Sequence, residues 1–102
     1  MPPTRLNDDE VRRRLERLPG WTLRDGKLHR EFTFPDFIRA FAFMTGTALR
    51  AEAMGHHPEW FNVYNRVVVD LVTHDAQGIT QLDFELAEHM HALAAATGAK
   101  VL

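Results

Sequence analysis

Three histidines offer the most reactive chemistry in the sequence, and two of them are adjacent. His56 and His57 stand directly before Pro58, and His74 follows later in the chain. Because proline fixes its own φ and pushes the preceding residue into an extended conformation, these residues form a stiff, polar corner. An imidazole has an unperturbed pKa of about 6.5, so one histidine can donate a proton while another accepts one. The pattern indicates acid–base chemistry by His56, His57 and His74.

Two carboxylates are candidate partners of these histidines. Glu52 lies eleven residues after Phe41, about three helical turns, and therefore near the stripe of expected core aromatics. It is either a solvated residue at a helix end or a carboxylate that orients a histidine. Asp83 follows His74 by nine residues. The pattern Thr80-x-x-Asp83 resembles a capping box, although Asp83 could also face a site from the helix N-terminus.

The remaining composition excludes several classes of site. The chain has no cysteine and no serine, which excludes disulfides, thiolate catalysis, cysteine-bound zinc and a serine nucleophile. No glycine-rich phosphate loop is present. Adjacent histidines point apart in an extended segment, and no His-x-x-x-His pair occurs, so we expect no metal site. The chemistry expected is therefore metal-free.

Length and charge define the class of protein. The 102 residues predict one domain, 1–102, and the 45% hydrophobic and 25% charged content is that of a globular protein. A net charge of −2 excludes a strongly basic footprint, so we expect no direct nucleic-acid binding. No apolar run reaches the roughly 20 residues that span a bilayer, and no apolar signal core follows Met1. We expect a cytoplasmic protein without membrane contact.

Hydrophobic periodicity and turn signals predict seven elements. Helices are expected at 6–18, 35–54 and 80–97, and strands at 21–24, 27–34, 60–64 and 67–74. Asp25-Gly26 is a strong hairpin signal because a type I′ turn needs positive φ at both central residues. The order α-β-β-α-β-β-α predicts the α+β class, with a two-layer, four-stranded antiparallel sheet and three helices on one face.

Two patterns within these elements bear on packing. The long helix is expected to bury one stripe of residues, with Ile38 and Phe34 beside it. Its members are Phe37, Phe41, Met44, Ala48 and Ala51. The second strand carries one residue that breaks its apolar face, Arg30. The opposite face of the sheet is expected to meet water or another subunit.

The spacing of the candidate residues resembles the pterin-4a-carbinolamine dehydratase family. The shared pattern is Glu52, three residues, His56-His57-Pro58, five residues, Tyr64, nine residues, His74, eight residues and Asp83. The stretch 56–65 is very close to the family's signature, and the resemblance covers nearly the whole chain after the first few residues. It implies the same fold and dehydration of a 4a-hydroxytetrahydropterin to quinonoid dihydropterin. The pterin is the substrate, and no cofactor is implied.

The resemblance also implies roles for individual residues. His56 and His74 are expected to form the proton-transfer pair, with the acid and the base left open, while His57 orients the pterin. Glu52 is expected to be the partner of His57 or to contact the ring, and Asp83 to orient His74 or hold a helix end. Two further residues are expected to contribute to substrate binding, Trp21 and Pro58, although Trp21 is equally well explained as a sheet-packing aromatic.

Partners and alternative functions follow from the same family. Its members form homodimers or dimers of dimers and serve aromatic amino-acid hydroxylases in tetrahydropterin recycling. Some animal members also bind a dimeric transcription factor and stabilise its dimer, which makes a protein-binding module the first alternative. A divergent homologue linked to molybdopterin cofactor metabolism is the second. The enzyme would depend on its histidines, whereas a binding module would depend on a surface helix.

Overall fold

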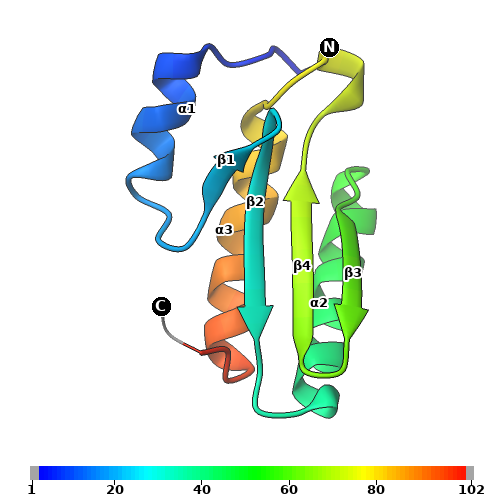
Figure 1. Ribbon diagram of the computed structural model, residues 1–102. Coiled ribbons are helices and arrows are strands. Elements are labelled where there is room, and N and C mark those ends of the chain that lie inside the picture. The colour runs from blue at the N-terminus through cyan, green and yellow to red at the C-terminus, as the bar shows by residue number, and fades with distance from the viewer. Residues whose placement is uncertain (1–2, 101–102) are drawn as a thin grey trace.

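A computed structural model describes residues 3–100 of the chain. The elements are α1 (Asp8–Leu15), β1 (Thr22–Arg24), β2 (Lys27–Thr33), α2 (Phe37–Met54), β3 (Glu59–Val63), β4 (Arg66–Leu71), the 3-10 helix η1 (His74–Ala76) and α3 (Gln81–Ala96). Figure 1 shows α2 and α3 behind the sheet and α1 beside its β1 edge. The expected α+β order of three helices and four strands is confirmed.

The four strands form one antiparallel sheet in the order β1-β2-β4-β3. The first hairpin turns at Asp25-Gly26, whose φ angles are 52° and 76°, as a type I′ turn requires. The second hairpin turns at Tyr64 and Asn65, one residue earlier than expected, and Tyr64 takes the positive φ of 51° there. β1 and β3 are the edge strands, so β3 has one side without a strand partner among residues 3–100.

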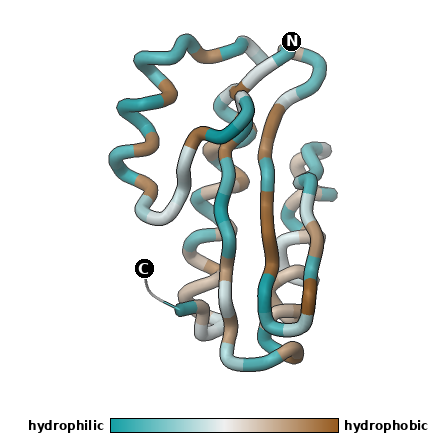
Figure 2. The backbone as a smooth tube through the Cα atoms, in the orientation of Figure 1, coloured by the Kyte–Doolittle hydropathy of each residue, from teal (hydrophilic) through white to brown (hydrophobic). Residues whose placement is uncertain are grey.

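The core lies between the sheet and the two long helices. Val67, Val69 and Leu71 of β4 are fully buried, and Figure 2 shows that the hydrophobic colour runs along most of this strand. The ring of Phe43 on α2 packs 4.8 Å from that of Phe32 on β2, measured between centroids. Burial of such side chains is the main favourable contribution to folding a chain of this length.

The expected core stripe of α2 is confirmed for Ala51 and wrong for Phe37 and Phe41. The buried residues of this helix are Ala40, Phe43, Thr47 and Ala51. Phe37 and Phe41, which the sequence assigned to the core, are 46% and 52% exposed, and Ile38 is 77% exposed. The helix is hydrophobic on two neighbouring faces, so periodicity alone could not tell which one packs. The face with the smaller residues does so, because small side chains let α2 approach the sheet and α3 closely.

Side chains near the helix starts fix where each helix begins. Asn7, Asp36 and Thr80 are the N-caps, each with its side chain accepting a backbone N–H of the first turn. The sequence suggested Pro35 as the first helical residue of α2. Pro35 instead precedes the N-cap, so the helix begins two residues later than expected. The last strand ends at Leu71, and His74 opens a 3-10 helix instead of ending a strand. No helix within residues 3–100 is long and apolar enough to cross a membrane.

Candidate active site

His56 is held at the point where α2 ends. Gly55 closes the helix with a φ of 65°, and the N–H of His56 donates to the carbonyl of Ala51 at 3.0 Å. The His56 side chain is buried, and its Nε2 lies 2.6 Å from Oδ1 of Asp83 in the first turn of α3. Asp83 is fully buried. One short contact therefore connects the end of α2 to the start of α3.

The other oxygen of Asp83 is occupied by hydrogen bonds from its own surroundings. Oδ2 accepts the N–H of Thr80 at 2.9 Å and the hydroxyl of Thr73 at 2.8 Å. An ionised carboxylate only accepts hydrogen bonds, so with Asp83 ionised the proton between the two groups belongs to Nε2 of His56. The capping-box interpretation of Thr80 and Asp83 is confirmed. The expectation that Asp83 orients His74 is wrong, since Asp83 contacts His56.

His57 forms a second, exposed pair. Its Nε2 lies 2.8 Å from Oε1 of Glu52, across the end of α2. The side chains of His57 and Glu52 are 62% and 81% exposed. Glu52 is therefore the expected partner of His57, but it does not lie on the buried stripe of the helix, as its spacing from Phe41 suggested. It points into solvent one position after the buried Ala51.

His74 forms the third pair, with a carboxylate that the sequence analysis did not single out. Nε2 of His74 lies 3.0 Å from Oε2 of Glu59, whose other oxygen accepts a hydrogen bond from the ammonium of Lys27. The hydrogen bond from Lys27, and after it the one from His74, lowers the pKa of Glu59 below its ordinary value. The same contact raises the pKa of Lys27. A carboxylate directly after His-His-Pro was the available signal for Glu59.

The three candidate histidines thus share one arrangement. Each is held through Nε2 by a carboxylate of its own, Asp83 for His56, Glu52 for His57 and Glu59 for His74. With the proton on Nε2, the neutral ring keeps a lone pair on Nδ1, which can accept a proton and later return it. The arrangement is suited to proton transfer at a bound molecule.

Two expected substrate-binding residues lie in different surroundings. Trp21 is 5% exposed and packs edge-to-face on Phe32, with ring centroids 5.9 Å apart, in agreement with its interpretation as a sheet-packing aromatic. Pro58 is half-buried between His57 and Glu59. Because proline is rigid, Pro58 fixes the spacing between His57 of one pair and Glu59 of another. Contact of either residue with a substrate stays a prediction.

A family model described as pterin 4 alpha carbinolamine dehydratase matches residues 4–93. The chain belongs to this family. A Solibacter usitatus (strain Ellin6076) protein provisionally named pterin-4-alpha-carbinolamine dehydratase is 60% identical over 92 residues, which are 90% of this chain and 97% of that protein. A Burkholderia multivorans protein of the same provisional name is 53% identical over 93 residues, covering 89% and 91% of the two chains.

A solved structure supports the same family membership. The crystal structure of a transcriptional coactivator/pterin dehydratase from Brucella melitensis superimposes with a TM-score of 0.86 at 48% sequence identity. The match covers 89% of this chain and 99% of that one. The family resemblance inferred from Glu52, the His-His-Pro corner, His74 and Asp83 is therefore confirmed.

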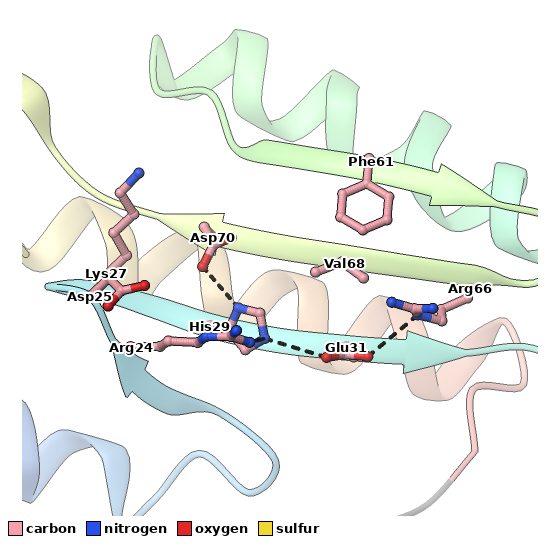
Figure 3. Close-up of a pocket in the computed structure, with 9 residues that line it drawn as sticks. All are labelled: Arg24, Asp25, Lys27, His29, Glu31, Phe61, Arg66, Val68 and Asp70. Atoms are coloured by element: carbon pink, nitrogen blue, oxygen red, sulfur yellow. Dashed lines mark hydrogen bonds and ion pairs between the residues drawn. The ribbon is translucent and has the colours of Figure 1, made fainter.

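The open face of the dehydratase-family sheet carries a separate hollow of about 420 Å³. Figure 3 shows Arg24, Asp70 and Glu31 around His29, whereas the Lys27 side chain points away from them. His29 lies 2.9 Å from Asp70, and Arg66 lies 3.4 Å from Glu31. Asp70, which interrupts the last strand in the sequence, is explained by this pair. Because these charges neutralise one another, the hollow is a solvated ion-pair network, and the three site histidines do not line it.

The described part of this dehydratase-family chain has no group of three or more His, Cys, Asp or Glu side chains placed to hold a metal ion. His56, His57 and His74 each face a different carboxylate instead of sharing one.

Proposed function

We propose that this chain is a pterin-4a-carbinolamine dehydratase, a hydro-lyase that converts a 4a-hydroxytetrahydropterin to quinonoid dihydropterin in tetrahydropterin recycling. Family membership supports the reaction class. The observation that carries the proposal is His56, whose Nε2 is fixed by the buried Asp83 so that Nδ1 remains for proton transfer. A histidine held in one tautomer by a buried carboxylate is suited to general acid–base catalysis.

The reaction needs proton transfer and no net electron transfer. The hydroxyl on C4a takes up a proton, the C4a–O bond breaks, and the oxygen leaves as water. The lone pair of N5 forms the new C4a=N5 double bond, and the proton on N5 passes to a base. One proton is taken up and one is released, so a pair of residues with matched pKa values is enough. No redox cofactor is required by this balance.

His56 and His74 are the proposed proton-transfer pair. His56 is buried and fixed, whereas the His74 side chain is 75% exposed and can exchange its proton with water. The acid and the base are left open, and the two assignments correspond to departure of the hydroxyl from opposite faces of the pterin ring. His57, held by Glu52, orients the pterin from the adjacent exposed position. Pro58 and Trp21 are proposed to support binding at the rigid corner and from the core.

The test of this proposal is dehydration of an enzymatically made 4a-hydroxytetrahydropterin, followed by stopped-flow absorbance. Folded wild-type protein should accelerate formation of the quinonoid product well above the uncatalysed rate. The same rate in the presence of a chelator would support metal-free catalysis. No acceleration by folded protein would overturn the dehydratase proposal for that substrate. It would favour the alternative role in molybdopterin metabolism or in protein binding.

We also propose that the chain associates with a second copy through α2 and β3. Large apolar side chains are exposed on both elements, namely Phe37, Ile38, Phe41 and Leu49 on α2 and Phe61, Val63 and Tyr64 on or beside β3. β3 is an edge strand, and unpaired strand edges favour pairing with another chain. Exposed apolar surface of this extent is typical of an interface between subunits.

Light scattering after size-exclusion chromatography tests this association. Ile38→Glu should shift the wild-type oligomer toward monomer, because a carboxylate would be buried in an apolar interface. Ala92→Glu, at an exposed position of α3, is the matched control and should leave the oligomer unchanged. A wild-type monomer at micromolar concentration, or an oligomer that tolerates Ile38→Glu, would contradict the proposed interface.

A further inference from the structure

One buried arginine in the structure has no acidic partner. Arg30 lies on β2, on the core side of the sheet between Leu28 and Phe32, and is only 7% exposed. Its guanidinium stands 4.5 Å from the centre of the Phe32 ring. Burial lowers the pKa of Arg30, and within residues 3–100 its polar partners are the carbonyl of Pro19 and the ring of His91, neither of them an acid. A buried charge without a counterion is costly, so its retention calls for an explanation.

The hydrogen bonds of Arg30 leave part of the guanidinium unused. Nη1 donates to the carbonyl of Pro19 at 2.7 Å and lies 2.9 Å from Nδ1 of His91. Nε is buried and has no hydrogen-bond partner. Both partners are neutral when Nδ1 of His91 accepts, so the positive charge of the guanidinium is not compensated. A guanidinium in this state is a ready partner for an anion.

The chain around Arg30 is shaped to hold the guanidinium in place. Gly20 has a φ of +85°, and a Cβ at that position would stand 2.6 Å from Cζ of Arg30. Only glycine permits both this backbone conformation and this close approach. The Pro19-Gly20 turn, the Phe32 ring and His91 therefore surround the guanidinium on several sides. Arg30 is a positioned group, unlike a surface arginine that moves freely in solvent.

A cavity of about 230 Å³ opens beside this arginine. Arg30, His91 and Lys100 contribute its nitrogen-bearing side chains, and none of the acidic residues among residues 3–100 lines it. The remaining walls are Pro19 and small apolar residues of and after α3, including Ala94 and Ala95. The volume exceeds what one or two water molecules need and suits a small organic molecule. A lining that combines these groups with alanines matches an anion with a short hydrocarbon body.

We propose that this cavity binds a small carboxylate, with its carboxylate group on Arg30 and its hydrocarbon part against the alanines of α3. His91 and Ala95 are four residues apart and therefore share one face of the helix. Asp83 precedes His91 by eight residues and Ala95 by twelve on this helix, which corresponds to about 12 Å and about 18 Å along the helix axis. The carboxylate site is thus separate from the proposed dehydration site and does not depend on it.

The test uses sodium butyrate as the probe and backbone amide NMR as the readout. Butyrate should shift the amide signals of Ala94, Ala95 and Ala99 and saturate with a Kd of roughly 1–10 mM. Ala95→Met keeps Arg30 but fills the cavity, and it should weaken binding by at least about tenfold. Ala92→Met, on the exposed part of α3 outside the cavity lining, should bind as the wild type does.

Titrations with other anions test whether the cavity selects a carboxylate. Sodium chloride and inorganic phosphate are titrated at the same ionic strength, and both should fail to saturate these signals. If the Arg30→Met variant folds, it should no longer bind butyrate. If it does not fold, the comparison of the wild type with Ala95→Met tests the site. No saturable shift with butyrate, or equal binding to the wild type and to Ala95→Met, would overturn the site. Tighter binding of phosphate than of butyrate would overturn the carboxylate class.

Discussion

Nε2 of His56 lies 2.6 Å from Oδ1 of Asp83, although the two residues are 27 positions apart in the chain. The same carboxylate caps α3 through the N–H of Thr80. One buried group therefore starts a helix and fixes the tautomer of a candidate catalytic ring. Stability and activity are expected to be linked at this position, because a change at Asp83 alters both hydrogen-bond sets at once.

Asp83→Asn changes both hydrogen-bond sets, and separate measurements report the effect on stability and the effect on activity. An asparagine oxygen can still accept from Thr80 and Thr73, but its amide nitrogen would face Nε2 of His56 and favour the other tautomer. We expect the free energy of unfolding to fall by about 1–3 kcal/mol and kcat by roughly 10²–10⁴-fold, with a smaller change in KM. Urea unfolding, steady-state kinetics and the ¹⁵N shifts of the His56 ring measure these effects. An unchanged kcat and an unchanged tautomer would contradict the positioning role.

Glu59→Gln tests the chain of contacts from Lys27 through Glu59 to His74. The pKa of Glu59 is lowered, so the stabilisation that its ionised form provides is present above the ordinary glutamate pKa. It is lost as the pH falls through the lowered pKa. The variant should therefore be less stable than the wild type near neutral pH, and the difference should shrink in acid. Urea midpoints measured from about pH 7 down to about pH 3 check this. A difference that stays constant over this range would argue against the ion pair.

Glu52→Gln addresses the exposed pair with His57. Both side chains are largely solvated, so the free energy of unfolding should change by less than about 0.5 kcal/mol. If His57 orients the pterin, the loss of its partner should raise KM more than it lowers kcat. Steady-state kinetics over a range of pterin concentrations distinguish the two parameters. A drop in kcat at constant KM would instead assign the pair to the proton-transfer step.

Two phenylalanines on α2 test which face of this helix is buried. Phe43 is fully buried, so Phe43→Ala should lower the free energy of unfolding by about 3–5 kcal/mol at every protein concentration. Phe41 is half-exposed, and Phe41→Ala should lower stability mainly at concentrations where the chain self-associates. Thermal or urea unfolding at several protein concentrations measures the stability of the two variants. Equal losses in dilute protein would place both rings in the core.

The sequence was informative where a signal is local. Asp25-Gly26 predicted its turn, and Thr80-x-x-Asp83 predicted its capping box, because both depend on residues within one turn of the chain. The element order and the α+β class followed from such signals. The histidine pattern was specific because the spacing between Glu52 and Asp83 involves many positions at once. The domain count and cytoplasmic location stay predictions.

The sequence was less informative where tertiary contacts decide. Asp83 could have faced His56 or His74, and only the packing of α3 against the end of α2 selects His56. Glu59 was not singled out because its partners, Lys27 and His74, come from β2 and from η1. The stripe of α2 was misassigned because aromatic residues occupy two of its faces. Spacing along one helix cannot show which face meets the sheet.

The proposed proton-transfer pair is tested most directly by stopped-flow dehydration of a 4a-hydroxytetrahydropterin, with chelator present. The comparison includes wild type, His56→Ala, His74→Ala and the control His89→Ala. His89 lies six residues, or about 9 Å, beyond Asp83 on α3. We predict that either site substitution lowers kcat by roughly 10²–10⁴-fold, while His89→Ala and the wild type turn over alike. Folded His56→Ala and His74→Ala proteins that retain the wild-type rate would contradict histidine acid–base catalysis at this site.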